Sequence, residues 1–361
     1  MLLNRLARQI IPIPRISIRM ASTIVGKSGR VYTQRGVLQE RKDASMSIFK
    51  AESHDKSFVL KRVSKPFYDL SLRLAADLPE SRRLRMHTDV SEDENVLIYP
   101  YYQDTLLGLL REDPEISDAA RSKILRDTGE AIQELHSENW IHIDIKPDNI
   151  LLNWTCDEEG TKTITHVALG DFDIAFKLEA GALLYTRHAV GNAMWRSPEG
   201  QTGRGLSKAS DVYSFGLVVM FTQCIYTLGA GELLLINNYQ ELVKLGITPE
   251  QEILTRHFSY FGSANDGLLR RISSEKWAKA FKSASQMAEL AVQDQPEMSF
   301  EVWGQELGLQ AQDMISRMTK MDPLARPEID DILAHLWWQE ETAGCIVGVA
   351  TGLCAFVCLG G

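Results

Sequence analysis

Short apolar runs separated by polar turns characterise the first hundred residues of the chain. From Arg30 to Val63 these runs are rich in β-branched and aromatic side chains, which suit the pleated, half-buried surface of a sheet. One more run of this kind follows about thirty residues later. The pattern therefore predicts strands at residues 31–32, 37–38, 46–50, 58–61 and 96–102.

Elsewhere the apolar residues recur at the spacing of a helix, and three helices are predicted from them. The first covers 66–80, with Phe67, Leu70, Leu74 and Leu78 on one face and Pro79 near its end. The others cover 104–113 and 117–138, and the second of these carries an apolar stripe made of Ile124, Leu125, Thr128, Ile132 and Leu135. Residues 245–310 carry no readable motif and are expected to be helical as well.

A strand at 140–142 and a hairpin built from 150–153 and 167–169 enclose the most polar stretch that carries chemistry. That stretch reads His-Ile-Asp-Ile-Lys-Pro-Asp-Asn over 142–149, and the hairpin delivers the chain to Asp171-Phe172-Asp173. The plain alternative is a polar turn between two strands.

Four of these side chains suit phosphoryl transfer, in which a protein mostly positions the reactants and neutralises charge. Asp144 can accept a proton from an attacking hydroxyl, and Lys146 can lie against a phosphate. Asn149 and Asp171 offer the oxygen ligands that Mg²⁺ prefers.

The same residues resemble the catalytic loop and metal-binding segment of protein kinases, H-R-D-x-x-x-x-N followed by D-F-G. The spacing of five between Asp144 and Asn149 matches that loop. Three later segments also resemble kinase motifs: 191–199 the G-T-x-x-Y-x-A-P-E run, 211–216 the D-V-W-S-x-G run, and 322–327 the D-P-x-x-R-P run. The resemblance covers roughly residues 30–340 and is clearest after residue 135.

This resemblance implies an α+β fold with two lobes, a small β-rich N-lobe at 30–102 and a larger, mainly helical C-lobe at 103–340. It implies that ATP and Mg²⁺ are cofactors and that a protein is the substrate. Lys61 would hold the α- and β-phosphates, and Asn149 with Asp171 would hold the metal. Leu38 would also contact the nucleotide, Pro100 would offer adenine its carbonyl group, and Tyr102 its N–H.

The implied catalytic residues are Asp144, which would orient the hydroxyl and take its proton, and Lys146, which would neutralise charge on the moving group. A lysine at position 146 resembles the catalytic loop of serine/threonine kinases. Glu199 and Arg326 would form the buried ion pair of the family, a structural feature.

Several positions depart from the kinase pattern. Residues 38–46 contain no glycine, although glycine lets backbone N–H groups approach a phosphate closely. The helix at 66–80 has no glutamate before Glu80 to pair with Lys61; Asp69 is a weak candidate, and the partner stays unassigned. Ile143 replaces an arginine that usually pairs with a phosphorylated activation loop, and Asp173 replaces a glycine.

Two functions from different classes follow. The first is a protein kinase that transfers the γ-phosphoryl group of ATP to serine or threonine hydroxyls of a protein. The alternative is a pseudokinase, a kinase-like module that binds partners without turnover, and the missing glycines and glutamate motivate it. The presence of Lys61, Asp144, Asn149 and Asp171 together favours the enzyme.

Composition and charge limit the partners. The first 39 residues carry seven basic residues and no acid, so the rest of the chain is more negative than its net charge of −9. An acidic body argues against general binding of nucleic acid and is compatible with basic peptides, although solubility alone explains it. Five cysteines form no regular framework and show no zinc-ligand spacing, so we expect an intracellular, reducing compartment.

The two ends of the chain differ from its body. Residues 1–29 form a basic leader that resembles a mitochondrial transit peptide or is a plain disordered tail, which leaves a cytoplasmic or mitochondrial location open. Residues 25–28 read Val-Gly-Lys-Ser but lack the first glycine of a phosphate-binding loop. The segment 341–361 is glycine-rich and 342–361 holds no charge, so it is either a membrane anchor, a flexible tail or an error in the predicted coding sequence.

Overall fold

The computed structural model describes residues 22–228, 244 and 246–339. The chain divides into two compact units. The first contains the chain up to Tyr68 together with His87–Tyr101, and the second contains Asp69–Met86 and the chain from Tyr102 onward. The leader as far as residue 21 and the tail at 341–361 lie outside the described residues.

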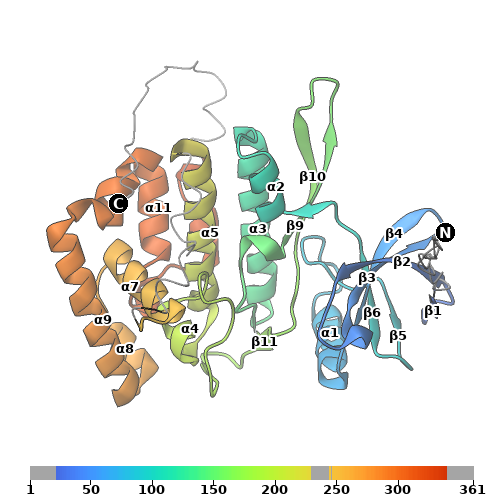
Figure 1. Cartoon of the computed structure of the whole chain (residues 1–361), viewed down its shortest axis with the longest axis horizontal. Helices are drawn as coiled ribbons and strands as arrows, with labels where there is room; N and C mark the ends of the chain where they lie inside the picture. The colour runs from blue at the N-terminus through green and yellow to red at the C-terminus, as the bar shows by residue number, and fades with distance from the viewer. Residues whose placement is uncertain (1–21, 229–243, 245, 340–361) are drawn as a thin grey trace, which may run out of the picture. The chain divides into compact units, whose positions relative to one another are not determined.

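An antiparallel six-stranded sheet forms the first unit, in the order β1-β2-β3-β4-β6-β5 (Figure 1). Its strands are β1 (Thr23–Val25), β2 (Val31–Gln39), β3 (Ile48–Ser53), β4 (Lys56–Arg62), β5 (Asp89–Ser91) and β6 (Val96–Pro100). The predicted strand runs lie within β2, β3, β4 and β6 or overlap them.

A small apolar cluster holds this sheet together. Tyr32 on β2 and Phe58 on β4 meet edge to face at 5.0 Å between ring centroids, and Ile98 on β6 is fully buried beside them. The β3–β4 turn uses His54 and Asp55, both with positive φ, as a two-residue hairpin turn requires. The turn residues and the apolar contacts between strands therefore both favour the observed pairing of β3 with β4.

Strand β1 was not predicted, and its turn shows why residues 25–28 are no phosphate loop. The turn closes around the carboxylate of Asp89, which accepts bonds from the Ser28 N–H at 3.2 Å and the Tyr32 hydroxyl at 3.0 Å. A Cβ on Gly26 would collide with that carboxylate. Burial alone would raise the pKa of Asp89, but the donors around it hold that pKa below its ordinary value. A structural carboxylate fills the place a phosphate would need.

Helix α1 (Lys65–Asp77) begins in the first unit and continues into the second. Leu74 is almost fully buried in the core of the second unit, and Leu70 and Leu78 pack against that core. The helix ends two residues before Pro79, because the residue before a proline disfavours helical backbone. The helix was predicted at 66–80, so its apolar face was identified and its end was placed three residues too late.

Helices make up most of the second unit (Figure 1). They are α2 (Leu106–Glu112), α3 (Asp118–Ser137), α4 (Pro198–Thr202), α5 (Lys208–Leu228), α7 (Pro249–Phe261), α8 (Asp266–Ile272), α9 (Glu275–Asp294), α10 (Phe300–Trp303), α11 (Leu309–Met318) and α12 (Ile329–Leu333). Ser117 caps α3 by accepting a bond from the Ala120 N–H, which explains where the predicted helix starts. The region 245–310 is helical, as expected.

Helix α5 lies at the centre of the second unit and packs against α3 and α11 (Figure 1). Its residues Leu217–Met220 are completely buried, although they point in all directions around the helix. A helix that is apolar on every side must be enclosed by other elements. This helix is therefore a rigid base for the loops that contact its N-terminal half.

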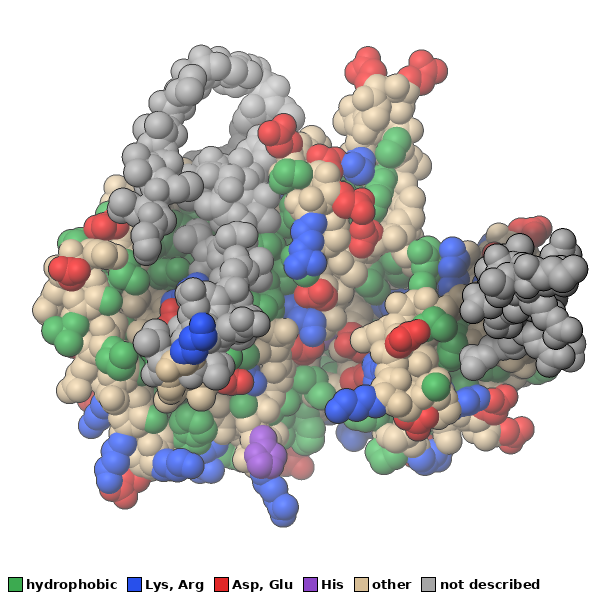
Figure 2. Space-filling view, viewed as in Figure 1, with side chains coloured by type: hydrophobic (Ala, Val, Ile, Leu, Met, Phe, Trp, Pro, Cys, Tyr) green, Lys and Arg blue, Asp and Glu red, His purple; other side chains and the backbone are tan. Residues whose placement is uncertain are grey.

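The described part of the second unit also contains seven strands, which form one three-stranded and two two-stranded sheets. They are β7 (Asp104–Thr105), β8 (Trp140–Ile141), β9 (Ile150–Cys156), β10 (Lys162–Leu169), β11 (Phe176–Lys177), β12 (Leu184–Tyr185) and β13 (Arg204–Leu206). The β9–β10 hairpin confirms the one predicted before Asp171. Its tip carries three exposed acidic residues at 157–159, and red acidic side chains are visible at this end of the hairpin in Figure 2.

The predicted pair of Glu199 and Arg326 is present and fully buried. The guanidinium donates to both carboxylate oxygens at 2.6 and 3.0 Å. Burial alone would raise the pKa of Glu199, but Arg326 outweighs this and holds the pKa below its ordinary value. The pair ties α4 to the segment before α12.

The α+β class is confirmed, with a small sheet unit followed by a mainly helical one. Among the described residues, no helix is both long enough and apolar enough to cross a membrane.

Candidate active site

The backbone of the loop after β8 is held by Asp211, near the start of α5. One carboxylate oxygen accepts from the His142 N–H and the other from the Ile143 N–H, both at 2.8 Å. Asp211 is fully buried, and His136 of α3 lies 3.0 Å from it. The central helix therefore fixes the position of residues 142–143.

His142 connects this loop to the segment that contains Asp171. Its Nε2 lies 2.9 Å from the carbonyl of Gly170, and its Nδ1 accepts a bond from the Asp144 N–H at 3.2 Å. Its ring also lies 5.1 Å from that of Phe172. These bonds need a proton on Nε2 and none on Nδ1, the tautomer of a neutral histidine.

The carboxylate of Asp144 is the centre of the loop. Its Oδ1 accepts from the Asn192 N–H at 2.7 Å. Its Oδ2 accepts from the Lys146 ammonium at 2.7 Å and from the Asn149 side-chain amide at 3.2 Å. The structure thus brings together three predicted site residues, Asp144, Lys146 and Asn149, through hydrogen bonds to one carboxylate.

The donors around Asn149 and Asp171 fit a magnesium ion. The NH₂ group of Asn149 is used in bonds to Asp144, which leaves its amide oxygen as the atom available to a cation. The Gly170 N–H donates to the Asn149 carbonyl at 2.9 Å, so the residue before Asp171 is tied to Asn149. Asp171 is exposed. Mg²⁺ is commonly bound by one or two protein oxygen atoms, with phosphates and water as its remaining ligands. Among the described residues, no group of three or more acidic, histidine or cysteine side chains could hold a metal ion by itself.

Ile143 occupies the position of the missing arginine, with a backbone φ of 59°. Its buried side chain packs with Ile141, Leu178 and Leu206, and Val190 lies against the same cluster. Gly191 contacts the Ile143 carbonyl so closely that a Cβ would collide with it. Apolar contacts therefore hold the segment before Asn192 against the catalytic loop.

Sequence reasoning missed the role of Asp77. Its carboxylate accepts from the Lys177 ammonium at 2.7 Å and from the Trp140 indole N–H at 2.9 Å. Hydrogen bonding from Lys177 holds the pKa of Asp77 below its ordinary value. The end of α1 is thus fixed to β8 and β11, the two strands that flank the catalytic loop and the segment after Asp171.

The other predicted nucleotide residues lie on several strands. Lys61 lies on β4, opposite Ile48 and Leu97, and is buried except for 7% of its surface. Leu38 lies exposed on β2, and Pro100 ends β6. Tyr102 belongs to the second unit, where its ring faces Arg85 and His166. Their roles toward a nucleotide stay predictions.

The connection between β2 and β3 contains no glycine, and hydrogen bonds from side chains hold its backbone in place. Asp43 caps a short 3₁₀ turn at Ala44–Met46 through the Ser45 N–H, 2.9 Å away. The Ser47 hydroxyl accepts from the Arg41 N–H at 3.1 Å. Polar capping therefore gives this connection its shape.

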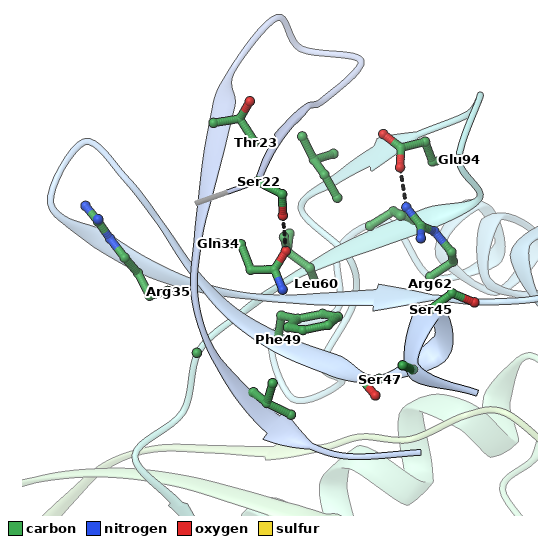
Figure 3. A pocket seen from close by; sticks show the side chains of 15 residues that line it. Ser22, Thr23, Gln34, Arg35, Ser45, Ser47, Phe49, Leu60, Arg62 and Glu94 are labelled. Atoms are coloured by element: carbon green, nitrogen blue, oxygen red, sulfur yellow. Dashed lines mark hydrogen bonds and ion pairs between the residues drawn. The ribbon is translucent and has the colours of Figure 1, made fainter. Parts of the chain in front are cut away.

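Figure 3 shows a hollow of about 610 Å³ on the sheet of the first unit, between β1 and β4. Phe49 and Leu60 line it with Gln34, which bonds to Ser22, and an Arg62–Glu94 ion pair lies at its rim. None of Leu38, Lys61 or Pro100 lines this hollow, so it is distinct from the predicted nucleotide residues.

His257 of α7 lies near Met194 and Arg196 and is buried between the rings of Tyr213 and Phe261. The pKa of His257 is lowered to about 4, chiefly by burial; the Met194 backbone opposes this shift and the positive charge of Arg196 adds to it. Because the ordinary value is 6.5, the unfolded chain takes up a proton before the folded chain does as the pH falls. Stability is therefore expected to decrease from pH 6.5 down to about 4.

Replacing His257 by Phe should remove the part of the stability loss between pH 6.5 and about 4 that comes from protonation of this side chain. Urea unfolding of both proteins between pH 7 and pH 4 measures it, and the stability difference between variant and parent should shift in favour of the variant as the pH falls. Parallel stability curves for the two proteins would show that His257 is not the responsible group.

The family model described as "Protein kinase domain" matches residues 82–338, more than half of the chain. The chain belongs to the protein kinase family. The matched region contains the whole catalytic loop and both segments that it contacts, and α1 and β1 to β4 of this kinase lie before it.

Curated relatives include serine/threonine and receptor kinases. The kinase is 33% identical over 115 residues to serine/threonine-protein kinase PknA of Mycobacterium tuberculosis, which covers 32% of this chain and 25% of PknA. It is 34% identical over 157 residues to the L-type lectin-domain containing receptor kinase SIT1 of Oryza sativa subsp. japonica, covering 40% and 22%. It is 31% identical over 215 residues to the L-type lectin-domain containing receptor kinase SIT2 of the same plant, which covers 55% of this chain and 28% of SIT2. The chain thus spans about a quarter of the length of these relatives.

Proposed function

We propose that this kinase is catalytically active and transfers the γ-phosphoryl group of ATP to serine or threonine hydroxyls of a protein. The observation that supports this most is the carboxylate of Asp144, held between Lys146, Asn149 and the Asn192 N–H. Serine/threonine specificity is supported by Lys146 and by the relatives' names.

Each residue has one task in this proposal. Asp144 orients the accepting hydroxyl and takes its proton, and Lys146 neutralises charge on the transferred group. Asn149 and Asp171 would hold Mg²⁺, which supplies charge neutralisation on the phosphates when it is bound. Lys61 would hold the α- and β-phosphates.

A pseudokinase is the second candidate, and two observations favour it. The connection between β2 and β3 has no glycine with which to approach a phosphate. In addition, both oxygens of Asp144 already accept hydrogen bonds from the protein, so an incoming hydroxyl must share an oxygen with an existing donor. Binding and turnover have to be measured separately to decide between the two.

Millimolar ATP with Mg²⁺ is expected to raise the melting temperature of the full chain. A ligand at a hundredfold excess over its Kd stabilises the folded state by about 2.7 kcal/mol. Asp171→Asn should reduce this rise because it replaces a negatively charged metal ligand by a neutral amide, whereas Asp148→Asn, at an exposed position of the same loop, should not. Thermal denaturation with ATP, Mg²⁺ and both together gives the answer. An identical melting temperature in all conditions would refute nucleotide binding.

A further inference from the structure

Arg196 is fixed in place beside the catalytic loop. Its Nε donates to the Gln201 side chain at 2.6 Å and its Nη1 to the Gly191 carbonyl at 3.2 Å. Two of its five N–H donors are used in these bonds. Burial lowers the pKa of Arg196 from its ordinary value of 12.5, and the carboxylates of Glu250 and Asp144 oppose this, so the side chain stays charged.

One peptide group joins this cation to the proposed base. The Gly191 carbonyl that accepts from Arg196 and the Asn192 N–H that donates to Asp144 belong to the same peptide bond. Given these two hydrogen bonds, the guanidinium lies no more than roughly 8 Å from the Asp144 carboxylate. An extended peptide advances roughly 3.5 Å per residue, so Arg196 is within reach of side chains one or two residues from a hydroxyl at Asp144.

Arg196 is the charged side chain of residues 191–199 that a substrate could contact. Trp195 is buried edge to face against Phe221 at 5.2 Å, and Met194 packs against Ile253. Within 191–199 the other ionisable side chain is Glu199, which is fully buried. The carboxylates of Glu250 and Asp144 lie close enough to act on the guanidinium, but the charge that residues 191–199 themselves offer a substrate is positive.

We infer that Arg196 is a specificity-determining residue, which selects protein substrates with a carboxylate side chain one or two residues from the accepting hydroxyl. This inference rests on the proposed function, since it names the substrate class of the same site. A fixed guanidinium recognises a carboxylate well because its planar donors are already oriented.

The test uses the full chain and serine peptides that carry Glu, Gln or Lys at each of the two positions before and after the serine. The kcat/KM ratio of the Glu to the Gln peptide is expected to be roughly three- to tenfold at the position that faces Arg196, the size of a partly exposed ion pair. Arg196→Gln should bring this ratio to about one, Arg196→Glu should favour Lys, and Arg196→Lys should keep a preference for Glu. Arg317→Gln on α11, which removes an exposed arginine, is the matched control and should keep the ratio.

Two further measurements keep the inference testable on its own. Peptide binding, followed by fluorescence anisotropy with ATP and Mg²⁺ present, should show the same preference without turnover. Raising the salt concentration should weaken the preference of the unmodified protein for the Glu peptide over the Gln peptide. This measurement does not depend on the folding of the Arg196 variants. Equal affinity for the Glu and Gln peptides at all four positions, or a preference that Arg196→Gln leaves intact, would overturn the inference. A binding preference that depends on Arg196, with no phosphorylation of any peptide, would overturn the proposed activity and leave Arg196's role standing.

Discussion

Replacing Asp144 by Asn is expected to reduce kcat by a factor of about 10²–10⁴, the usual contribution of a positioned general base. The amide can still accept the Asn192 N–H, but it cannot take a proton from the substrate. Its NH₂ group would also face the Lys146 ammonium and the Asn149 amide, which both donate to the carboxylate in the parent. Initial rates of peptide phosphorylation at saturating ATP measure the loss.

Asp148→Asn provides the matched control, because Asp148 is exposed and lies four residues further along the same loop. It removes the same charge from the chain and should leave kcat within about twofold. Both variants should melt within a few degrees of the parent. If Asp144→Asn retained the parent's kcat while folding normally, Asp144 would not be the base.

Arg326→Ala should lower the free energy of unfolding by about 3–5 kcal/mol, because it leaves the Glu199 carboxylate buried without its partner. Arg326 also donates to the carbonyls of Ala209 and Lys320 and lies over the Tyr213 ring, so several contacts are lost together. Chemical denaturation gives the value. Arg317→Ala, at an exposed pair with Asp313, should cost less than about 1 kcal/mol.

The pH dependence and a double variant separate the lost charge pair from lost packing. Since the pKa of Glu199 is held below its ordinary 4.5, the pair's stabilisation is fully present above that pH and is lost as the pH falls through the lower folded value. Arg326→Met combined with Glu199→Gln should cost less than Arg326→Ala alone, because no buried charge remains. A double variant as unstable as the single one would assign the loss to packing instead.

The sequence predicted the elements whose signals are local and repeated. The apolar stripe of α3, bounded by Ser117 at its start, put the helix within one residue at each end. The catalytic loop was predicted because Asp144, Lys146 and Asn149 lie within six residues of each other, a spacing that one short loop must bring together. Glu199 and Arg326, 127 residues apart, were paired only through the family resemblance.

Other features depend on contacts that no local pattern records. Asp77 meets Lys177 across 100 residues of chain, and Asp211 holds the His142 backbone from 69 residues away. Strand β1, like β11 and β12, is only two or three residues long, too short to show alternation. The position of Arg196 beside Asp144 follows from the turn at Gly191, so the sequence alone gave no sign of it.

Transfer of labelled phosphate from γ-labelled ATP to serine and threonine peptides by the purified full chain decides whether this kinase is catalytically active. We expect labelled phosphoserine or phosphothreonine whose formation requires Mg²⁺ and Asp144, at rates that Asp148→Asn does not change. Nucleotide binding without any transfer above the Asp144→Asn background, on acidic, neutral and basic peptides alike, would contradict it and identify the chain as a pseudokinase.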